Sequence, residues 1–158
     1  MASEVIGIGD LKVNFARVRK DMELRTSRVM VVAGGGVLKR KAKAIAQAKG
    51  LRKTGAFIKN IVIKRETKAP AGTTQYNLGV RHGHNLTRKQ KTKSSLAINR
   101  GRIVKRYEDD PFYWRFLEFD TKHRTGTPVI GEALAQGKEE AVQAMGVALV
   151  KDLEKAGK

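Results

Sequence analysis

Few side chains in this sequence have the type and spacing that chemistry requires. His82 and His84 flank a glycine, and a His-x-His pair can bind a metal ion. No third ligand stands at a suitable spacing, and Arg81 and Arg88 would repel a cation. We therefore expect no metal site and no cofactor.

The candidates for acid–base or nucleophilic catalysis are equally weak. Glu118 and Asp120 lie on opposite sides of the chain or in a turn, so they form a poor acid pair. Ser94 and Ser95 stand in a lysine-rich stretch without a partnered base. We expect no catalytic residues, and we predict that the protein is not an enzyme.

Three consecutive glycines, residues 34–36, raise the question of a phosphate-binding loop. Such a loop places its glycines between a strand and a helix and ends in Lys followed by Ser or Thr. Here the glycines follow a predicted helix, and Val37 and Leu38 stand where that end would be. The glycines predict either a break between two helices or a close approach by a neighbouring segment.

The composition sets broader bounds. A length of 158 residues fits a single domain, 1–158, with a modest core. The absence of cysteine excludes disulfides and thiolate metal sites, and it fits synthesis inside a cell. The sequence contains no run of about 18 apolar residues, so we expect no membrane span. The N-terminus does not resemble a signal peptide.

Net charge is the strongest global signal, at +18, and its excess lies in the middle of the chain. Residues 34–68 carry eleven basic residues and one acidic residue, and residues 69–108 carry nine and one. Residues 109–158 instead carry seven basic and nine acidic residues. Such a one-signed field repels itself, which favours a polyanionic partner or a solvated, extended segment.

Apolar periodicity and turn residues predict the elements that position these charges. We expect helices over 8–33 and 37–49, strands over 56–66 and 74–80 that pair antiparallel, and a last helix over 130–155. The predicted fold class is α+β, with N-terminal helices, a small and mostly antiparallel sheet of three to four strands, and a C-terminal helix packed on that sheet.

Two segments stand apart from these elements. Residues 82–108 are basic and nearly free of large apolar side chains, which predicts a long loop or insertion. Residues 112–119 hold five of the nine aromatic residues and are expected to form a strand that is apolar on both faces. In so small a chain, another subunit can cover the second face. The predicted core or subunit-interface residues are Phe112, Tyr113, Trp114, Phe116, Leu117 and Phe119.

Several short motifs follow the predicted N-terminal helices in a fixed order: the Lys53-Thr54-Gly55 junction, the Phe116–Thr121 stretch FLEFDT, Thr127-Pro128, and Glu132-Ala133 at the start of the last helix. Their order resembles the tail-completion, or head–tail joining, family of long-tailed double-stranded DNA phages, akin to the Z-type minor tail proteins of lambdoid phages. These motifs span most of the chain.

The resemblance implies a structural virion protein of the tail or neck, made in the host cytoplasm. Such proteins form a ring, here expected to be a hexamer, at the head-proximal end of the tail. The ring completes the tail and joins it to the capsid around the DNA path. The implied neighbours are the tail terminator, the tail tube, the head-closure ring and the double-stranded DNA in the lumen, with no membrane.

A ring around DNA tolerates sequence-independent positive charge on its inner wall. We therefore expect a set of basic residues to face either the DNA path or acidic neighbouring proteins, and the sequence leaves both options open. This set comprises Lys39, Arg40, Lys43, Arg88, Lys89, Lys91, Lys93, Arg100, Arg102, Lys105 and Arg106.

Two alternative functions share these features. A tail terminator that caps the tail tube would occupy the same part of the particle. A free, sequence-independent nucleic-acid-binding protein would share the charge and need no ring. The second is disfavoured because the aromatic residues are not interleaved with the basic run as stacking platforms.

Overall fold

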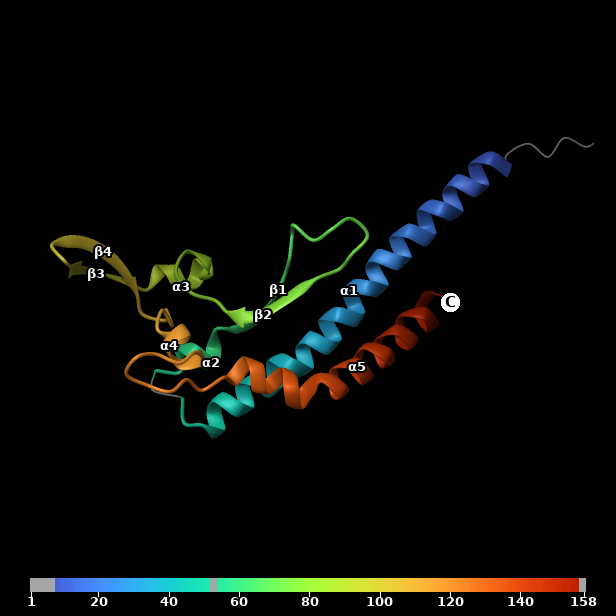
Figure 1. The fold of residues 1–158 in the computed structure, drawn as a ribbon. Helices are drawn as coiled ribbons and strands as arrows, with labels where there is room; N and C mark the ends of the chain where they lie inside the picture. The colour runs from blue at the N-terminus through green and yellow to red at the C-terminus, as the bar shows by residue number, and fades with distance from the viewer. Residues whose placement is uncertain (1–7, 52–53, 157–158) are drawn as a thin grey trace, which may run out of the picture.

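The computed structural model describes residues 8–51 and 54–156 of the chain. Two long helices dominate it: α1, Ile8–Ala48, and α5, Val129–Ala156. Figure 1 shows them side by side, with the N-terminal part of α1 extending beyond the C-terminal end of α5. Lys53 of the Lys-Thr-Gly junction lies outside the described residues, as do residues 1–7, on which the expectation about a signal peptide rests.

The remaining elements are short. They are α2, Ala56–Lys59; β1, Ile61–Arg65; β2, Tyr76–Val80; the 3-10 turn η1, Gly83–Asn85; α3, Arg88–Thr92; β3, Ser94–Asn99; β4, Arg102–Tyr107; and α4, Trp114–Glu118. Strand β1 pairs antiparallel with β2, and β3 with β4, as two separate two-stranded sheets. In the part of the chain that the structure describes, no helix is long and apolar enough to cross a membrane.

The α+β class is confirmed, as are the antiparallel pairing of the first two strands and the last helix. The sheet prediction was wrong in detail, because four strands form two sheets rather than one. The packing of the C-terminal helix was also wrong, because α5 lies along α1 instead of on a sheet. A helix with a stripe of small residues can pack closely along the length of another helix. A two-stranded sheet offers a smaller area for such a contact.

Three further predictions fail for local reasons. The predicted strand 56–66 begins as helix α2, which buries Ala56, Phe57 and Ile58 in one turn. The predicted loop 82–108 contains α3 and the β3–β4 hairpin. The predicted aromatic strand 112–119 is a turn followed by α4, so the alternation of its faces does not apply.

The hydrophobic core lies where the ends of α1 and α5 meet α2 and β1. Phe57, Ile61, Val129 and Ala133 are fully buried there, against Ala42 and Ala46 of α1. Tyr113, Trp114 and Leu117 cover this core from the α4 side, half-buried. Small residues on the helices let large residues from the short elements fill the space between them.

The glycine run 34–36 does not break α1. Gly34 instead faces α5, and a Cβ atom there would lie 2.8 Å from Cγ of Met145 and 3.0 Å from the carbonyl oxygen of Ala141. A Cβ atom on Gly35 would lie 3.2 Å from Cγ2 of Ile63. Of the two alternatives that the sequence left open, close approach by neighbouring segments is therefore the correct one, and the packed interface offsets the helix-breaking tendency of glycine.

Among the described side chains, three ion pairs join α1 and the residue after it to α5: Arg25 with Asp152, Lys41 with Glu140, and Lys49 with Glu132. Asp152 also accepts a 2.7 Å hydrogen bond from the Thr26 hydroxyl. This hydrogen bond, together with the one from Arg25, holds the pKa of the Asp152 carboxyl below its usual range, against the opposing effect of burial. The pairs fix the register of the two helices more than they stabilise them, because most of their side chains are partly exposed.

Replacing Gly34 with Ala should destabilise the protein by about 1–3 kcal/mol, because the added methyl group forces α5 away from α1. The matched control is Gly36→Ala, where the nearest atom to an added Cβ is Nη1 of Arg40 at 3.9 Å. That substitution should stabilise the helix by about 0.5–1 kcal/mol. Urea unfolding followed by circular dichroism measures both, and equal effects of the two substitutions would contradict the close packing at Gly34.

Candidate functional site

The segment from the end of β2 to the start of α4 carries most of the residues predicted to be functional. We call residues 87–107, which hold α3 and the β3–β4 hairpin, the basic arm. Figure 1 shows the hairpin projecting from the α2–α4 end of the molecule, away from the α1–α5 pair. The arm holds eight of the predicted charge-site residues: Arg88, Lys89, Lys91, Lys93, Arg100, Arg102, Lys105 and Arg106.

The root of the arm is held by one buried amide. Asn60 is only 1% exposed, and its Oδ1 accepts a 2.8 Å hydrogen bond from Nε2 of Gln90 in α3. Its Nδ2 donates 2.9 Å hydrogen bonds to the carbonyl oxygens of Ala56 and Asp109, the latter just after β4. One side chain therefore ties both ends of the arm to α2.

Local hydrogen bonds set the geometry where the chain enters the arm. Thr87 and Gln90 form a capping box at the start of α3, with each side chain bonded to the backbone N–H of the other residue. Leu86 is buried just before this point and anchors the entry to the arm. The root of the arm is thus held by specific hydrogen bonds and one buried side chain, although α3 spans only five residues.

The tip of the arm is a two-residue turn at Arg100 and Gly101. Both residues have positive φ, 50° and 74°, as a hairpin turn of the type I′ class requires. Arg100 is the only non-glycine residue with positive φ in the described part of the chain. Asparagine or glycine would fit this conformation with less strain, so the arginine places a cation at the tip at a cost of about 1 kcal/mol or more.

The two faces of the hairpin differ in chemistry. Directly opposed residues share a face, and the register pairs Leu96 with Lys105 and Ile98 with Ile103 on the face that we call the apolar face. Leu96, Ile98 and Ile103 are 75%, 80% and 74% exposed.

The other side of the hairpin is the basic face. There the register pairs Ser95 with Arg106, Ala97 with Val104, and Asn99 with Arg102. Both arginines are exposed. None of the ion pairs among the described residues uses a lysine or arginine of the arm, and the sequence contains no Asp or Glu from residue 67 to residue 107. The arm therefore cannot neutralise its own charge.

The remaining predicted cations lie elsewhere. Lys39, Arg40 and Lys43 belong to the C-terminal part of α1, and Figure 1 shows this part of α1 well apart from the hairpin. Burial lowers the pKa of Lys43, and the neighbouring charge of Lys39 lowers it further. The structure thus divides the predicted basic surface into two sites, of which the arm is the larger and the more exposed.

The aromatic segment separates into an inner and an outer set. Tyr113, Trp114 and Leu117 pack against the core, whereas Phe112, Phe116 and Phe119 are about 60% exposed. We call these three residues the phenylalanine surface. One of them, Phe116, also lines a largely apolar cavity of about 520 Å³, together with Gly50, Leu51, Thr54, Tyr113, Leu117 and Arg124.

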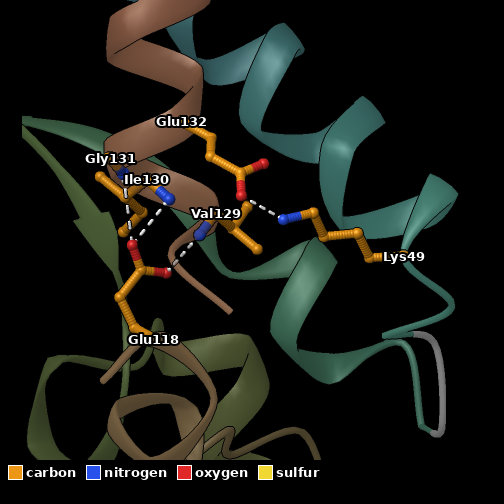
Figure 2. A network of polar contacts seen from close by, with 6 residues as sticks. All are labelled: Lys49, Glu118, Val129, Ile130, Gly131 and Glu132. Carbon is orange, nitrogen blue, oxygen red and sulfur yellow. Dashed lines mark hydrogen bonds and ion pairs between the residues drawn. The ribbon is translucent and has the colours of Figure 1, made fainter. Parts of the chain in front are cut away.

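Glu118 is the residue whose role the sequence did not reveal. Its side chain is 7% exposed and points at the N-terminus of α5, as Figure 2 shows. Its two carboxylate oxygens accept hydrogen bonds of 3.0, 2.7 and 3.3 Å from the backbone N–H groups of Val129, Ile130 and Gly131. The negative charge also interacts favourably with the dipole of α5. Glu118 is a helix cap supplied by a separate element.

The turn between α4 and α5 supports this cap. Oδ1 of Asp120 accepts a 2.7 Å hydrogen bond from the N–H of Gly126, and the N–H of Thr127 donates to the carbonyl oxygen of Leu117. Glu118 and Asp120 therefore each bond to backbone groups and do not form the acid pair considered from sequence. No three His, Cys, Asp or Glu side chains gather as a metal site among the described residues.

Comparison of the chain with protein-family models, with curated protein sequences and with solved structures gives no match.

Replacing Glu118 with Ala should lower the free energy of unfolding by about 2 kcal/mol, because three N–H groups of α5 lose their acceptor. Glu118→Gln retains one acceptor oxygen and should cost less. Glu139→Ala, at an exposed position of α5, is the control and should change stability by less than about 0.5 kcal/mol. Thermal or urea unfolding provides the measurement, and a Glu118→Ala variant as stable as the control would rule out the cap.

Proposed function

We propose that this protein is a structural virion protein of the neck or tail of a long-tailed double-stranded DNA phage. In this role it forms a ring at the head-proximal end of the tail, completes the tail and joins it to the capsid around the DNA path. The observation that carries the proposal is the basic arm, which projects eight cations and has no carboxylate of its own.

The contacts of Glu118 place the resembling motifs in one part of the fold. Glu118 of the Phe116–Thr121 stretch caps helix α5, which begins directly after Thr127-Pro128 and contains Glu132-Ala133. The capped N–H groups belong to Val129, Ile130 and Gly131, between these last two motifs.

The arm fits a wall that faces DNA better than a free binding module. A hairpin with an exposed apolar face and a separate basic face needs an apolar partner for the first and an anionic partner for the second. Phosphates satisfy only the basic face. A ring subunit meets both demands, because neighbouring protein covers the apolar face while the lumen presents DNA to the other.

The expected result in particles is a low copy number. Quantitative mass spectrometry of purified phage particles, both intact and separated into heads and tails, should find about one ring of this protein per particle, with the tail or neck fraction. Recovery of the protein on cellular nucleic acid, together with its absence from particles, would replace the proposal with a free nucleic-acid-binding protein.

The basic face can be tested with Arg102→Gln combined with Arg106→Gln. If the face contacts phosphates, the slope of log affinity for duplex DNA against log salt should become shallower by about 2, equally for unrelated sequences. Lys138→Gln combined with Lys151→Gln, at exposed positions of α5, removes the same charge and should leave the slope nearly unchanged. Equal slopes for all three proteins would favour acidic protein neighbours for the arm.

A further inference from the structure

We propose that the apolar face of the basic arm docks on a second copy of this chain, at its phenylalanine surface and the adjoining cavity. The inference rests on the proposed ring and names the contact that would build it. The contact is heterologous, because the arm of one copy meets a different surface on the next, and such contacts generate rings or filaments.

The first argument is that the apolar face of the hairpin is exposed to solvent and lacks a covering element. Leu96, Ile98 and Ile103 are each at least 74% exposed, and both strands of their hairpin are edge strands. A two-stranded hairpin is marginally stable alone and needs a further strand or a helix against its apolar side. DNA phosphates cannot provide that cover, so the occupant is protein.

The second argument is that each chain carries a matching uncovered surface. Phe112 and Phe116 are about 60% exposed, and the ring of Phe112 meets that of Tyr113 edge to face at 5.6 Å between centroids. Tyr113 and Phe116 both line the cavity of about 520 Å³. Aliphatic side chains of a hairpin can fill an aromatic-lined cavity of this size. A single kind of contact then covers both surfaces on every copy.

The third argument is charge. The arm belongs to a stretch, residues 67–107, with ten basic and no acidic residues. Residues 108–124, which hold the phenylalanine surface and the turn after it, carry four acidic residues that are at least partly exposed and three basic ones, Arg115, Lys122 and Arg124; a fifth carboxylate, Glu118, is buried as the cap of α5. Glu108 and Asp120 are exposed and can face the cations of an incoming arm. Arg124, which lines the cavity, opposes this attraction, so we expect the arm cations to lie on the Glu108 side.

The arm does not make this contact within its own chain. Its root is tied to α2 through Asn60, and Figure 1 shows the hairpin directed away from the end where α4 lies against the core. The contacts that hold the arm off its own phenylalanine surface therefore leave its apolar face open to a neighbouring copy.

Disulfide capture tests the contact directly, because the chain has no cysteine of its own. Leu96→Cys protein and isotope-labelled Phe116→Cys protein are mixed at high concentration and oxidised, and the mixed dimer is measured by mass. Both positions are exposed, so neither substitution removes a core side chain. A covalent trap accumulates even a weak contact, and we expect the mixed dimer in several-fold excess over the controls.

The matched control replaces Leu96→Cys with Ser95→Cys, which is adjacent in sequence but on the basic face. A second control replaces Phe116→Cys with Ala71→Cys, at an exposed turn between β1 and β2. Mixed dimer formed equally by Ser95→Cys and Leu96→Cys, or no mixed dimer at the highest soluble concentration, would overturn the proposed docking.

Particles that carry both Leu96→Cys and Phe116→Cys separate this inference from the proposed function. On oxidation they should yield a ladder of covalent oligomers up to the size of the ring. If the chain is present in particles but oxidation yields no ladder, the proposed docking is refuted and the proposed function is not. The mixed dimer in solution, with the chain absent from particles, would refute the virion role and leave self-association standing.

Discussion

The close approach of α1 and α5 is the constraint on which the rest of the structure depends. It is possible because glycines stand where the helices touch: Gly34 against Met145, and Gly137 against Leu38 and Lys41. Without side chains at these points the helix backbones come close enough for the small residues Ala42, Ala46 and Ala133 to be buried. This packing leaves room at one end of the pair for Phe57 and Ile61, and hence a place where the short elements attach.

Two buried polar side chains then connect the short elements to this frame. Glu118 joins α4 to the start of α5, and Asn60 joins α2 to both ends of the basic arm. Each satisfies several backbone or side-chain groups that would otherwise be buried without a partner, which makes both contacts specific. The phenylalanine surface and the arm therefore keep fixed positions on the molecule although neither belongs to a large sheet or a long helix.

The sequence allowed the long helices, the first hairpin and the location of the charge to be predicted, because these follow from periodicity and composition. It did not show whether the glycine run 34–36 breaks the helix or packs against a neighbouring segment, because the position of the partner helix decides between the two. The aromatic segment was misread because a dense aromatic run has high strand propensity, whereas burial of Tyr113, Trp114 and Leu117 on one side favours a helical turn.

The roles of Glu118 and Asn60 were not visible for a related reason. Apart from Ala56, which accepts a hydrogen bond from Asn60, their partners lie 11 to 49 residues away, at distances in sequence over which no local rule operates. A signal for Glu118 did exist, in the form of a carboxylate shortly before a proline-led helix start. Glu118 was considered only as half of an acid pair with Asp120, which was rejected, because the turn that returns the chain to α5 could not be foreseen. For Asn60, an amide among aliphatic residues was read as part of a strand.

The basic arm combines exposed apolar side chains with cations that form no ion pair among the described residues. Its root is satisfied by Asn60 and the capping box, and its tip is held by a turn in which Arg100 is strained. Between root and tip, the chain supplies neither cover for the apolar face nor carboxylates for the cations. These two features need different surroundings, because an apolar surface can cover the first and only anions can neutralise the second.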